Sequence, residues 1–292
     1  MATVLKGAPV AAAIADDLKE RVAALAQAGV TPTLALVRVG ERSDDLSYER
    51  GAVKRCDAVG VAVRREVLPA DCTTGDLLAR IDALNNDANV HGCLLFRPLP
   101  AHLDERRACA ALASDKDVDC ATDASLLGVL ANRPVGFAPC TAEAVIALLD
   151  HYDVPLEGAD VCVVGRSLVI GKPVAMMLQA RNATVTMCHT RTRDLPGVCR
   201  RAQVLVVAAG HAKTVGAACA SASQTVVDVG INWDEQASRL VGDVDFDEVE
   251  PLVAGITPVP GGIGAVTTAV LARHVVEAAE RVASTAIDGG AR

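Results

Sequence analysis

The stretch Val163-Val164-Gly165-Arg166-Ser167-Leu168-Val169-Ile170-Gly171-Lys172-Pro173 decides the fold of this 292-residue chain. An apolar run, a glycine turn and the start of a helix follow one another, which is the order found at nucleotide-phosphate sites. Gly165 lets the backbone approach a diphosphate, and the amides of a helix that begins near Gly171 attract phosphate oxygens. The spacing Gly-x-Ser-x-x-x-Gly departs from the usual Gly-x-Gly-x-x-Gly, so an ordinary strand-to-helix turn is the alternative at this point.

The flanking residues extend this turn into a strand-helix-strand unit. Apolar, β-branched runs predict the two strands, and a helix fits between them. These elements are expected at residues 160–164, 172–181 and 183–187. Two more apolar runs, 204–210 and 225–230, end in glycine, and their lack of polar alternation is typical of parallel strands covered on both faces. The second half of the chain is therefore predicted to be a dinucleotide-binding parallel sheet.

The tip of the second strand distinguishes between cofactors. Enzymes that use NAD usually carry an Asp or Glu there to hold the adenosine ribose, whereas residues 188–193 of this chain contain no acid. Arg166 and Arg191 would bind a ribose phosphate that a carboxylate would repel. The pattern favours NADP over NAD, with ordinary solvated arginines as the alternative.

Composition limits the remaining functions. A chain with 51% hydrophobic residues can bury a core large enough for two domains, and its net charge of −8 offers no basic field for nucleic acid. We find no signal-peptide pattern and no apolar run long enough to span a membrane, which predicts a cytoplasmic protein without a membrane partner. The ten cysteines form no Cys-x-x-Cys pair, so we expect reduced core thiols and no metal.

The first half has its own alternation of helices and strands. Helices are expected at residues 9–28, 46–59, 73–86, 103–113 and 143–151, and strands at 33–39, 61–68 and 90–95. Thr73 is the expected N-cap of its helix, and Pro98-Leu99-Pro100 ends the last strand rigidly. This order predicts a second α/β domain.

Several longer strings occur in a fixed order along the chain. They are Lys116-Asp117-Val118-Asp119, Pro139-Cys140-Thr141, Arg181-Asn182-Ala183-Thr184-Val185-Thr186, Asp228-Val229-Gly230-Ile231-Asn232, Val241-Gly242-Asp243-Val244-Asp245-Phe246 and Thr257-Pro258-Val259-Pro260-Gly261-Gly262-Ile263-Gly264. With these strings the chain resembles the bifunctional methylenetetrahydrofolate dehydrogenase/cyclohydrolase family over nearly its whole length.

The resemblance implies a two-domain α/β fold with a cleft between the domains. A folate domain at residues 1–139 would be completed by a C-terminal helix at 264–292, and a Rossmann-like parallel-sheet NADP domain would span 140–263. The resemblance also implies a homodimer formed through the NADP domains. The family passes hydride from methylenetetrahydrofolate to the nicotinamide, and water then opens the methenyl cation to formyltetrahydrofolate.

The resemblance further assigns residues to the two ligands. The cofactor would contact Gly165, Arg166, Ser167, Gly171, Pro173, His189, Arg191 and Ile231. The folate would contact Tyr48, Pro98, Leu99, Asp119, Gly261, Gly262 and Thr267. Tyr48 would stack on the flat ligand and Asp119 would pair with the pterin nitrogens, which makes both catalytic residues by the family pattern. A tyrosine that anchors its own helix and a loop aspartate are the structural alternatives.

The chain departs from the family at the residues of the second step. Family members carry Tyr-x-x-x-Lys, and here Ala52 takes the place of the lysine after Tyr48, while Phe96 replaces the glutamine that partners this lysine. Lys54 lies a rotation of roughly 200° further along the helix and would point to another face unless the helix is frayed or shifted. Arg97 would not deprotonate and is a poor proton shuttle. We therefore expect weak or lost cyclohydrolase activity.

Other changes on the folate side leave three hypotheses open. Residues 120–123 are Cys-Ala-Thr-Asp where the family has Gly-Phe-His-Pro, and residues 264–267 are Gly-Ala-Val-Thr where it has Gly-Pro-Met-Thr. The first hypothesis is an NADP-dependent dehydrogenase on methylenetetrahydrofolate without cyclohydrolase activity. The second is an oxidoreductase on another iminium or amine substrate, and the third is a catalytically silent folate- or nucleotide-binding homologue. The retained cofactor residues weigh against the third.

Overall fold

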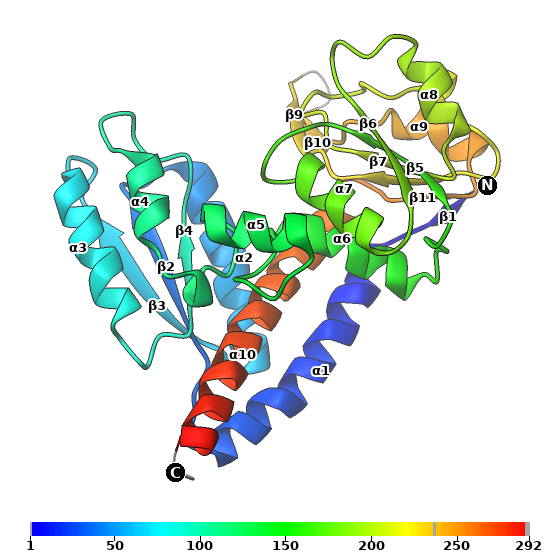
Figure 1. The fold of residues 1–292 in the computed structure, drawn as a ribbon. Helices are drawn as coiled ribbons and strands as arrows, with labels where there is room; N and C mark the ends of the chain where they lie inside the picture. The colour runs from blue at the N-terminus through cyan, green and yellow to red at the C-terminus, as the bar shows by residue number, and fades with distance from the viewer. Residues whose placement is uncertain (1, 236–237, 290–292) are drawn as a thin grey trace. The chain divides into compact units, whose positions relative to one another are not determined.

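The computed structural model describes residues 2–235 and 238–289, and the chain divides into two compact units (Figure 1). We call Met1–Ala12 with Thr141–Thr267 the large-sheet unit, and Ala13–Cys140 with Thr268–Arg292 the small-sheet unit. Each unit contains one parallel sheet, which confirms the predicted two-domain α/β class. Residues 290–292, the end of the predicted C-terminal helix, lie outside the described residues.

The small-sheet unit is built on three parallel strands in the order β3-β2-β4. Its elements are β2 (Thr33–Val39), α2 (Ser43–Val59), β3 (Ala62–Leu68), α3 (Thr74–Asn85), β4 (Gly92–Leu95), α4 (Glu105–Ala111), the 3-10 helix η1 (Ser114–Lys116) and α5 (Asp123–Ala131). The long helices α1 (Gly7–Gln27) and α10 (Ile263–Gly289) contribute most of their length to this unit. The sequence predicts this order except for the short helix η1 and for α5, whose short run of leucines has no helical periodicity.

Local sequence accounts for most of these elements. The central strand β2 is buried from Leu34 to Val39 because an apolar run in mid-sheet is covered on both faces. Thr73 is the N-cap of α3, as predicted, and forms a capping box in which its hydroxyl accepts from Asp76 N at 3.2 Å.

The two longest helices lie side by side (Figure 1). Arg21 of α1 donates to Glu280 of α10 at 2.7 Å, so an ion pair links the two helices. No helix within the described residues is long and apolar enough to cross a membrane.

The large-sheet unit contains six parallel strands in the order β1-β11-β8-β7-β5-β6 and one antiparallel hairpin, β9-β10. Its elements are β1 (Thr3–Val4), α6 (Cys140–His151), β5 (Asp160–Val164), α7 (Gly171–Ala180), β6 (Thr184–Cys188), α8 (Leu195–Arg201), β7 (Val204–Val207), η2 (Ala217–Cys219), β8 (Thr225–Asp228), β9 (Asn232–Asp234), β10 (Arg239–Val241), α9 (Phe246–Val249), η3 (Glu250–Leu252) and β11 (Gly255–Ile256). The predicted strands β5 to β8 are confirmed, and β7 is buried throughout.

The strand order places a switch point between β5 and β7. The chain passes from β5 through α7 to the edge strand β6, then crosses back through α8 to β7 on the other side of β5. Ligands of open α/β sheets bind at the carboxyl ends of strands where the order reverses in this way. The glycine turn after β5 lies at this point.

The start of the chain belongs to the large sheet, which differs from the boundaries expected from the sequence. We assigned residues 1–139 to the first domain, but β1 pairs with β11 in parallel, with Thr3 opposite Gly255 and Val4 opposite Ile256. A strand of two residues carries too little pattern to predict a pairing with a partner about 250 residues away. The division between the units falls within α1 and again within α10.

Candidate functional site

The glycine turn after β5 has the geometry of a phosphate loop. Gly165 adopts a positive φ of 135°, and a Cβ atom at this position would collide with the carbonyl oxygen of Ala208 after β7. A Cβ atom at Gly171 would collide with the backbone of Gly165. Both positions therefore require glycine, because the turn folds tightly against the end of the neighbouring strand.

Ser167 organises the entry into α7. Its hydroxyl accepts from Ile170 N at 3.1 Å and from Gly171 N at 3.4 Å, and its carbonyl accepts from Lys172 N at 3.0 Å. Pro173 has no N–H to satisfy and is buried in the first turn of the helix, where proline is favoured. The turn is thus held in shape by side-chain and backbone bonds, and the positive end of α7 faces the space beside it.

The tip of β6 forms a compact second turn. His189 N donates to Thr192 Oγ1 at 2.8 Å, and Arg191 N donates to His189 Nδ1 at 3.1 Å. Gly165 N donates to Cys188 O at 2.9 Å, which ties this tip to the glycine turn. The side chains of Arg166 and Arg191 are exposed, one on each turn. Two cations and no acid at this place suit a ribose phosphate.

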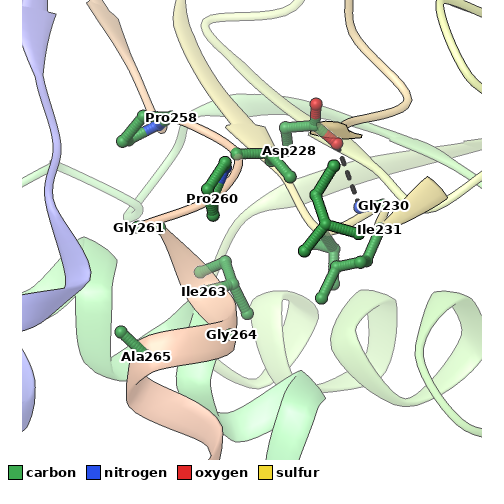
Figure 2. Close-up of a pocket in the computed structure, with 13 residues that line it drawn as sticks. Asp228, Gly230, Ile231, Pro258, Pro260, Gly261, Ile263, Gly264 and Ala265 are labelled. Carbon is green, nitrogen blue, oxygen red and sulfur yellow. Dashed lines mark hydrogen bonds between the residues drawn. The ribbon is translucent and has the colours of Figure 1, made fainter. Parts of the chain in front are cut away.

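A pocket of about 260 Å³ lies in the same unit, between the loop after β8 and the turn before α10 (Figure 2). Its lining includes Ile231, Gly261 and Gly262, so the structure brings one predicted cofactor residue and two predicted substrate residues to a single pocket. The Ile231 side chain is 61% exposed. Such an apolar, solvent-facing surface suits a flat heteroaromatic ring.

Asp228 stabilises the loop of residues 228–231, which lines this pocket. Its carboxylate accepts from the backbone N–H groups of Gly230 at 3.0 Å, Asp243 at 3.0 Å and Val244 at 2.9 Å. Burial raises the pKa of Asp228 to about 7, although these three donors favour the charged form. Its role is to fix the loop, because its oxygens are engaged by backbone groups.

The predicted folate residues Tyr48, Pro98, Leu99 and Asp119 lie in the small-sheet unit, as do the departures from the family pattern at residues 52, 96 and 120–123. The departures at residues 265–266 lie in the large-sheet unit. Ala52 is fully buried on α2 and Lys54 is exposed, as the helix geometry predicts. The Phe96 ring lies edge-on to the Tyr48 ring, with centroids 6.0 Å apart at 84°. An aromatic pair therefore occupies the space beside Tyr48.

Asp119 is held by the backbone of the segment before α6. Its Oδ1 accepts from Cys140 N at 2.9 Å. Burial raises the pKa of this carboxyl group, while the Cys140 N–H and the charge of Arg97 act in the opposite direction. Burial, followed by the charge of Asp119, raises the pKa of Tyr48 well above its usual value. The charge of Asp119 thus acts on Tyr48, and the charge of Arg97 acts on Asp119.

Three other predicted contacts have structural roles as well. Leu99 is 9% exposed and packs in the small-sheet core, and its N–H donates to Glu105 Oε2 at 2.7 Å. Pro98 is exposed, and its carbonyl accepts from Arg42 at 2.7 Å. Thr267 is buried, and its hydroxyl donates to Ile263 O within α10 at 3.2 Å.

Cys140 and His274 are two residues beside the site that the sequence alone does not predict. Both contact the Val118-Asp119 segment, and the string Pro139-Cys140-Thr141 was the signal that could have drawn attention to the first. His274 offered no local signal, because its role depends on a contact 156 positions away in the chain.

The fold and these turns define a class: a two-domain α/β oxidoreductase with a dinucleotide-binding parallel sheet. Comparison with known proteins gives the family. The family model described as Tetrahydrofolate dehydrogenase/cyclohydrolase, catalytic domain, matches residues 5–119, and the one described as Tetrahydrofolate dehydrogenase/cyclohydrolase, NAD(P)-binding domain, matches residues 139–283. The chain belongs to the tetrahydrofolate dehydrogenase/cyclohydrolase family, as the sequence predicts.

Individual relatives extend over nearly the whole chain. The bifunctional protein FolD of Carboxydothermus hydrogenoformans is 49% identical over 281 residues, which cover 96% of this chain and 98% of that protein. The crystal structure of the bifunctional enzyme FolD from Campylobacter jejuni has a TM-score of 0.93 and 37% identity, covering 96% of this chain and 99% of that one. The FolD structure from Trypanosoma brucei, complexed with NADP cofactor and inhibitor, has a TM-score of 0.89 and 34% identity, covering 96% and 98%.

Proposed function

We propose that this protein oxidises 5,10-methylenetetrahydrofolate with NADP and that its cyclohydrolase step is weak or lost. One observation carries the second half of this proposal: Ala52 is fully buried, and the Phe96 ring lies against Tyr48, where the family has a lysine and a glutamine. The family assignment and the geometry of the phosphate turn support the first half.

The two steps make different demands on the protein. Hydride transfer requires the donor carbon and the nicotinamide to be held close together and dry, because the folate nitrogen stabilises the cation that forms. Opening the cation requires water to attack and protons to move, and a positioned acid–base group typically contributes 10²–10⁴-fold. A methyl and a phenyl group offer no proton, so the first step survives the exchanges and the second does not.

Two cations near the site do not replace the missing lysine. Lys54 is exposed on another face of α2. Arg97 is half-buried, and its charge acts on Asp119, but a guanidinium group stays protonated and cannot shuttle a proton. Its charge is suited to keeping Asp119 ionised.

The residues of the large-sheet unit fit the cofactor. Gly165 and Gly171 allow the backbone to approach a diphosphate, and α7 directs its positive end toward the phosphates. Arg166 and Arg191 would hold the adenosine ribose phosphate, which makes NADP the preferred cofactor, and Ile231 would support the nicotinamide ring. The bound cofactor supplies the hydride acceptor.

We also propose a homodimer formed through the large-sheet unit. The edge strand β6 supports this, because strand order leaves one of its sides unpaired and its burial pattern shows exposed and half-buried positions. Unpaired backbone groups of an edge strand can pair with another chain. A cytoplasmic location stays a prediction.

One assay tests the proposed activity. The protein is incubated with methylenetetrahydrofolate and NADP, and NADPH and methenyltetrahydrofolate are recorded together. We expect the two products to rise in equal amounts, with the methenyl absorbance then decaying at the rate of protein-free buffer. Rapid decay that scales with protein concentration would refute the loss of the cyclohydrolase step, and no NADPH formation would refute the dehydrogenase assignment.

The changed residues 120–123 favour a second candidate, an oxidoreductase on another iminium or amine substrate. Cys120 has a positive φ of 56° where the family has glycine, so the loop beside Asp119 carries a side chain that the family lacks. If folate is not oxidised but other cyclic amines are, this candidate replaces the first.

A further inference from the structure

A buried histidine from the last helix contacts the peptide group that precedes Asp119, the proposed pterin carboxylate. His274 of α10 is 1% exposed, and its Nδ1 lies 2.8 Å from Val118 O, the carbonyl next to Asp119 in the chain. A carbonyl oxygen only accepts, so Nδ1 carries a proton and donates to it. The hydrogen bond fixes both the tautomer of the ring and the orientation of the peptide that leads into Asp119.

Cys140 makes two further contacts with the same segment. Its backbone N–H donates to Asp119 Oδ1 at 2.9 Å, and its thiol donates to Val118 O at 3.2 Å. The thiol also lies 3.6 Å from His274 Nδ1. Side chains and backbone from two helices, α6 and α10, thus converge on residues 118–119.

The histidine is itself held in place. The Phe137 ring lies 4.9 Å from the imidazole, tilted by 30°, and the Arg281 guanidinium group lies 4.2 Å above the Phe137 ring. This packing holds the imidazole in the orientation that donates to Val118 O.

The direction of the carboxylate matters for the chemistry. Pairing with a ring N–H and an amino group requires both carboxylate oxygens to lie in the plane of the ligand, and small rotations weaken both bonds. The segment Asp117–Asp119 runs beside β4, with Asp117 bridged to Cys93, so it has a firm support on one side. His274 and Cys140 supply the support on the other.

We propose that His274 is a positioning residue that aims the Asp119 carboxylate at the substrate through the Val118 carbonyl. This inference rests on the proposed function, in which Asp119 pairs with the pterin. His274 thereby takes part in substrate recognition without touching the substrate.

The experiment is a double-mutant cycle measured as folate and NADP dissociation constants. The variants are His274→Leu, His274→Asn and Asp119→Asn, and the last is combined with each of the first two. We expect His274→Leu to raise the folate dissociation constant about tenfold, the effect of one lost hydrogen bond, and to leave NADP binding unchanged. His274→Asn keeps an N–H donor and should restore most of the affinity. In the Asp119→Asn background, His274→Leu should have no further effect on folate binding.

A matched control separates positioning from core packing. Val276, two positions along α10, is fully buried, and Val276→Ala should lower the melting temperature without weakening folate binding. If His274→Leu weakens folate binding equally with and without Asp119, or weakens NADP binding to the same extent, it acts through general destabilisation and the inference is wrong. If Asp119→Asn lowers folate affinity and His274→Leu does not, the inference alone is wrong. If Asp119→Asn leaves folate binding unchanged, the folate assignment is wrong and the inference falls with it.

Discussion

The glycine turn of the large-sheet unit and the Tyr48–Phe96 pair of the small-sheet unit depend on different features of the chain. The turn depends on backbone geometry: two glycines whose Cβ positions are blocked, and a serine whose hydroxyl accepts from backbone N–H groups at the start of the next helix. The region around Tyr48 depends on the chemistry of side chains: Ala52 on α2 and Phe96, directly after β4, are apolar where the family pattern has a lysine and a glutamine. Under the proposed function, the difference means that a substrate site loses one reaction through side-chain exchanges while its fold is kept.

The largest effect is expected from restoring the two family side chains beside Tyr48. Ala52→Lys together with Phe96→Gln should raise methenyltetrahydrofolate hydrolysis by about 10²–10⁴-fold over the wild-type protein, because an acid–base group returns beside the reacting carbon. Hydrolysis is measured by the decay of methenyl absorbance.

The single variants serve as controls for that pair. Ala52→Lys alone places an ammonium beside the Phe96 ring, and Phe96→Gln alone leaves an amide without its lysine, so each should recover less than the double variant. Efficient hydrolysis by the wild-type protein would contradict the proposed loss of the cyclohydrolase step.

Asp119→Ala tests the substrate side by itself. Loss of a charge-assisted pair corresponds to about 1.5–3 kcal/mol, so the folate dissociation constant should rise roughly 10- to 150-fold. NADP affinity should not change, because Arg166 and the glycine turn belong to the other unit. Isothermal titration with each ligand checks both statements, and parallel losses for the two ligands would disprove the separation.

Arg166→Ala tests the cofactor side. Arg166 is exposed, so we expect the lower end of the range for a charged hydrogen bond, about tenfold weaker NADP binding, with NAD binding unchanged. Arg191→Ala serves as the comparison at the second turn. Wild-type protein that binds NAD as tightly as NADP would contradict the proposed cofactor preference.

The raised pKa of Asp119 predicts how folate affinity depends on pH. Burial raises this pKa, so the carboxyl group takes up its proton at a higher pH than an ordinary aspartate. Since the charged form pairs with the pterin, folate affinity should be constant above that pKa and fall several-fold as the pH drops through it. Asp119→Asn should remove the dependence. Folate affinity that is constant down to the usual aspartate range would contradict the prediction.

The smallest expected effect lies outside both sites. Thr73→Ala removes the capping box of α3 and should lower the free energy of unfolding by about 1 kcal/mol. Folate and NADP affinities should stay at their wild-type values. Denaturant unfolding gives the stability, and a change in either affinity would show that the regions are less independent than we argue.

The sequence by itself determined the elements whose signals are local. The apolar runs gave β5 to β8, Thr73 and Asp76 gave the start of α3, and the helical period placed Ala52 inside and Lys54 outside. Resemblance to a known family supplied the expected substrate and reaction, and the departures at residues 52 and 96 are the basis for the proposed loss of the cyclohydrolase step.

Only the tertiary structure decided the features that depend on contacts between distant residues. Three features join segments that are far apart in the chain. They are the pairing of β1 with β11, the hydrogen bonds of Cys140 and His274 to residues 118–119, and the pocket formed by residues 228–231 and 258–265. The physical reason is that hydrogen-bond geometry and close packing depend on three-dimensional neighbours, whereas periodicity and capping depend on residues within a few positions.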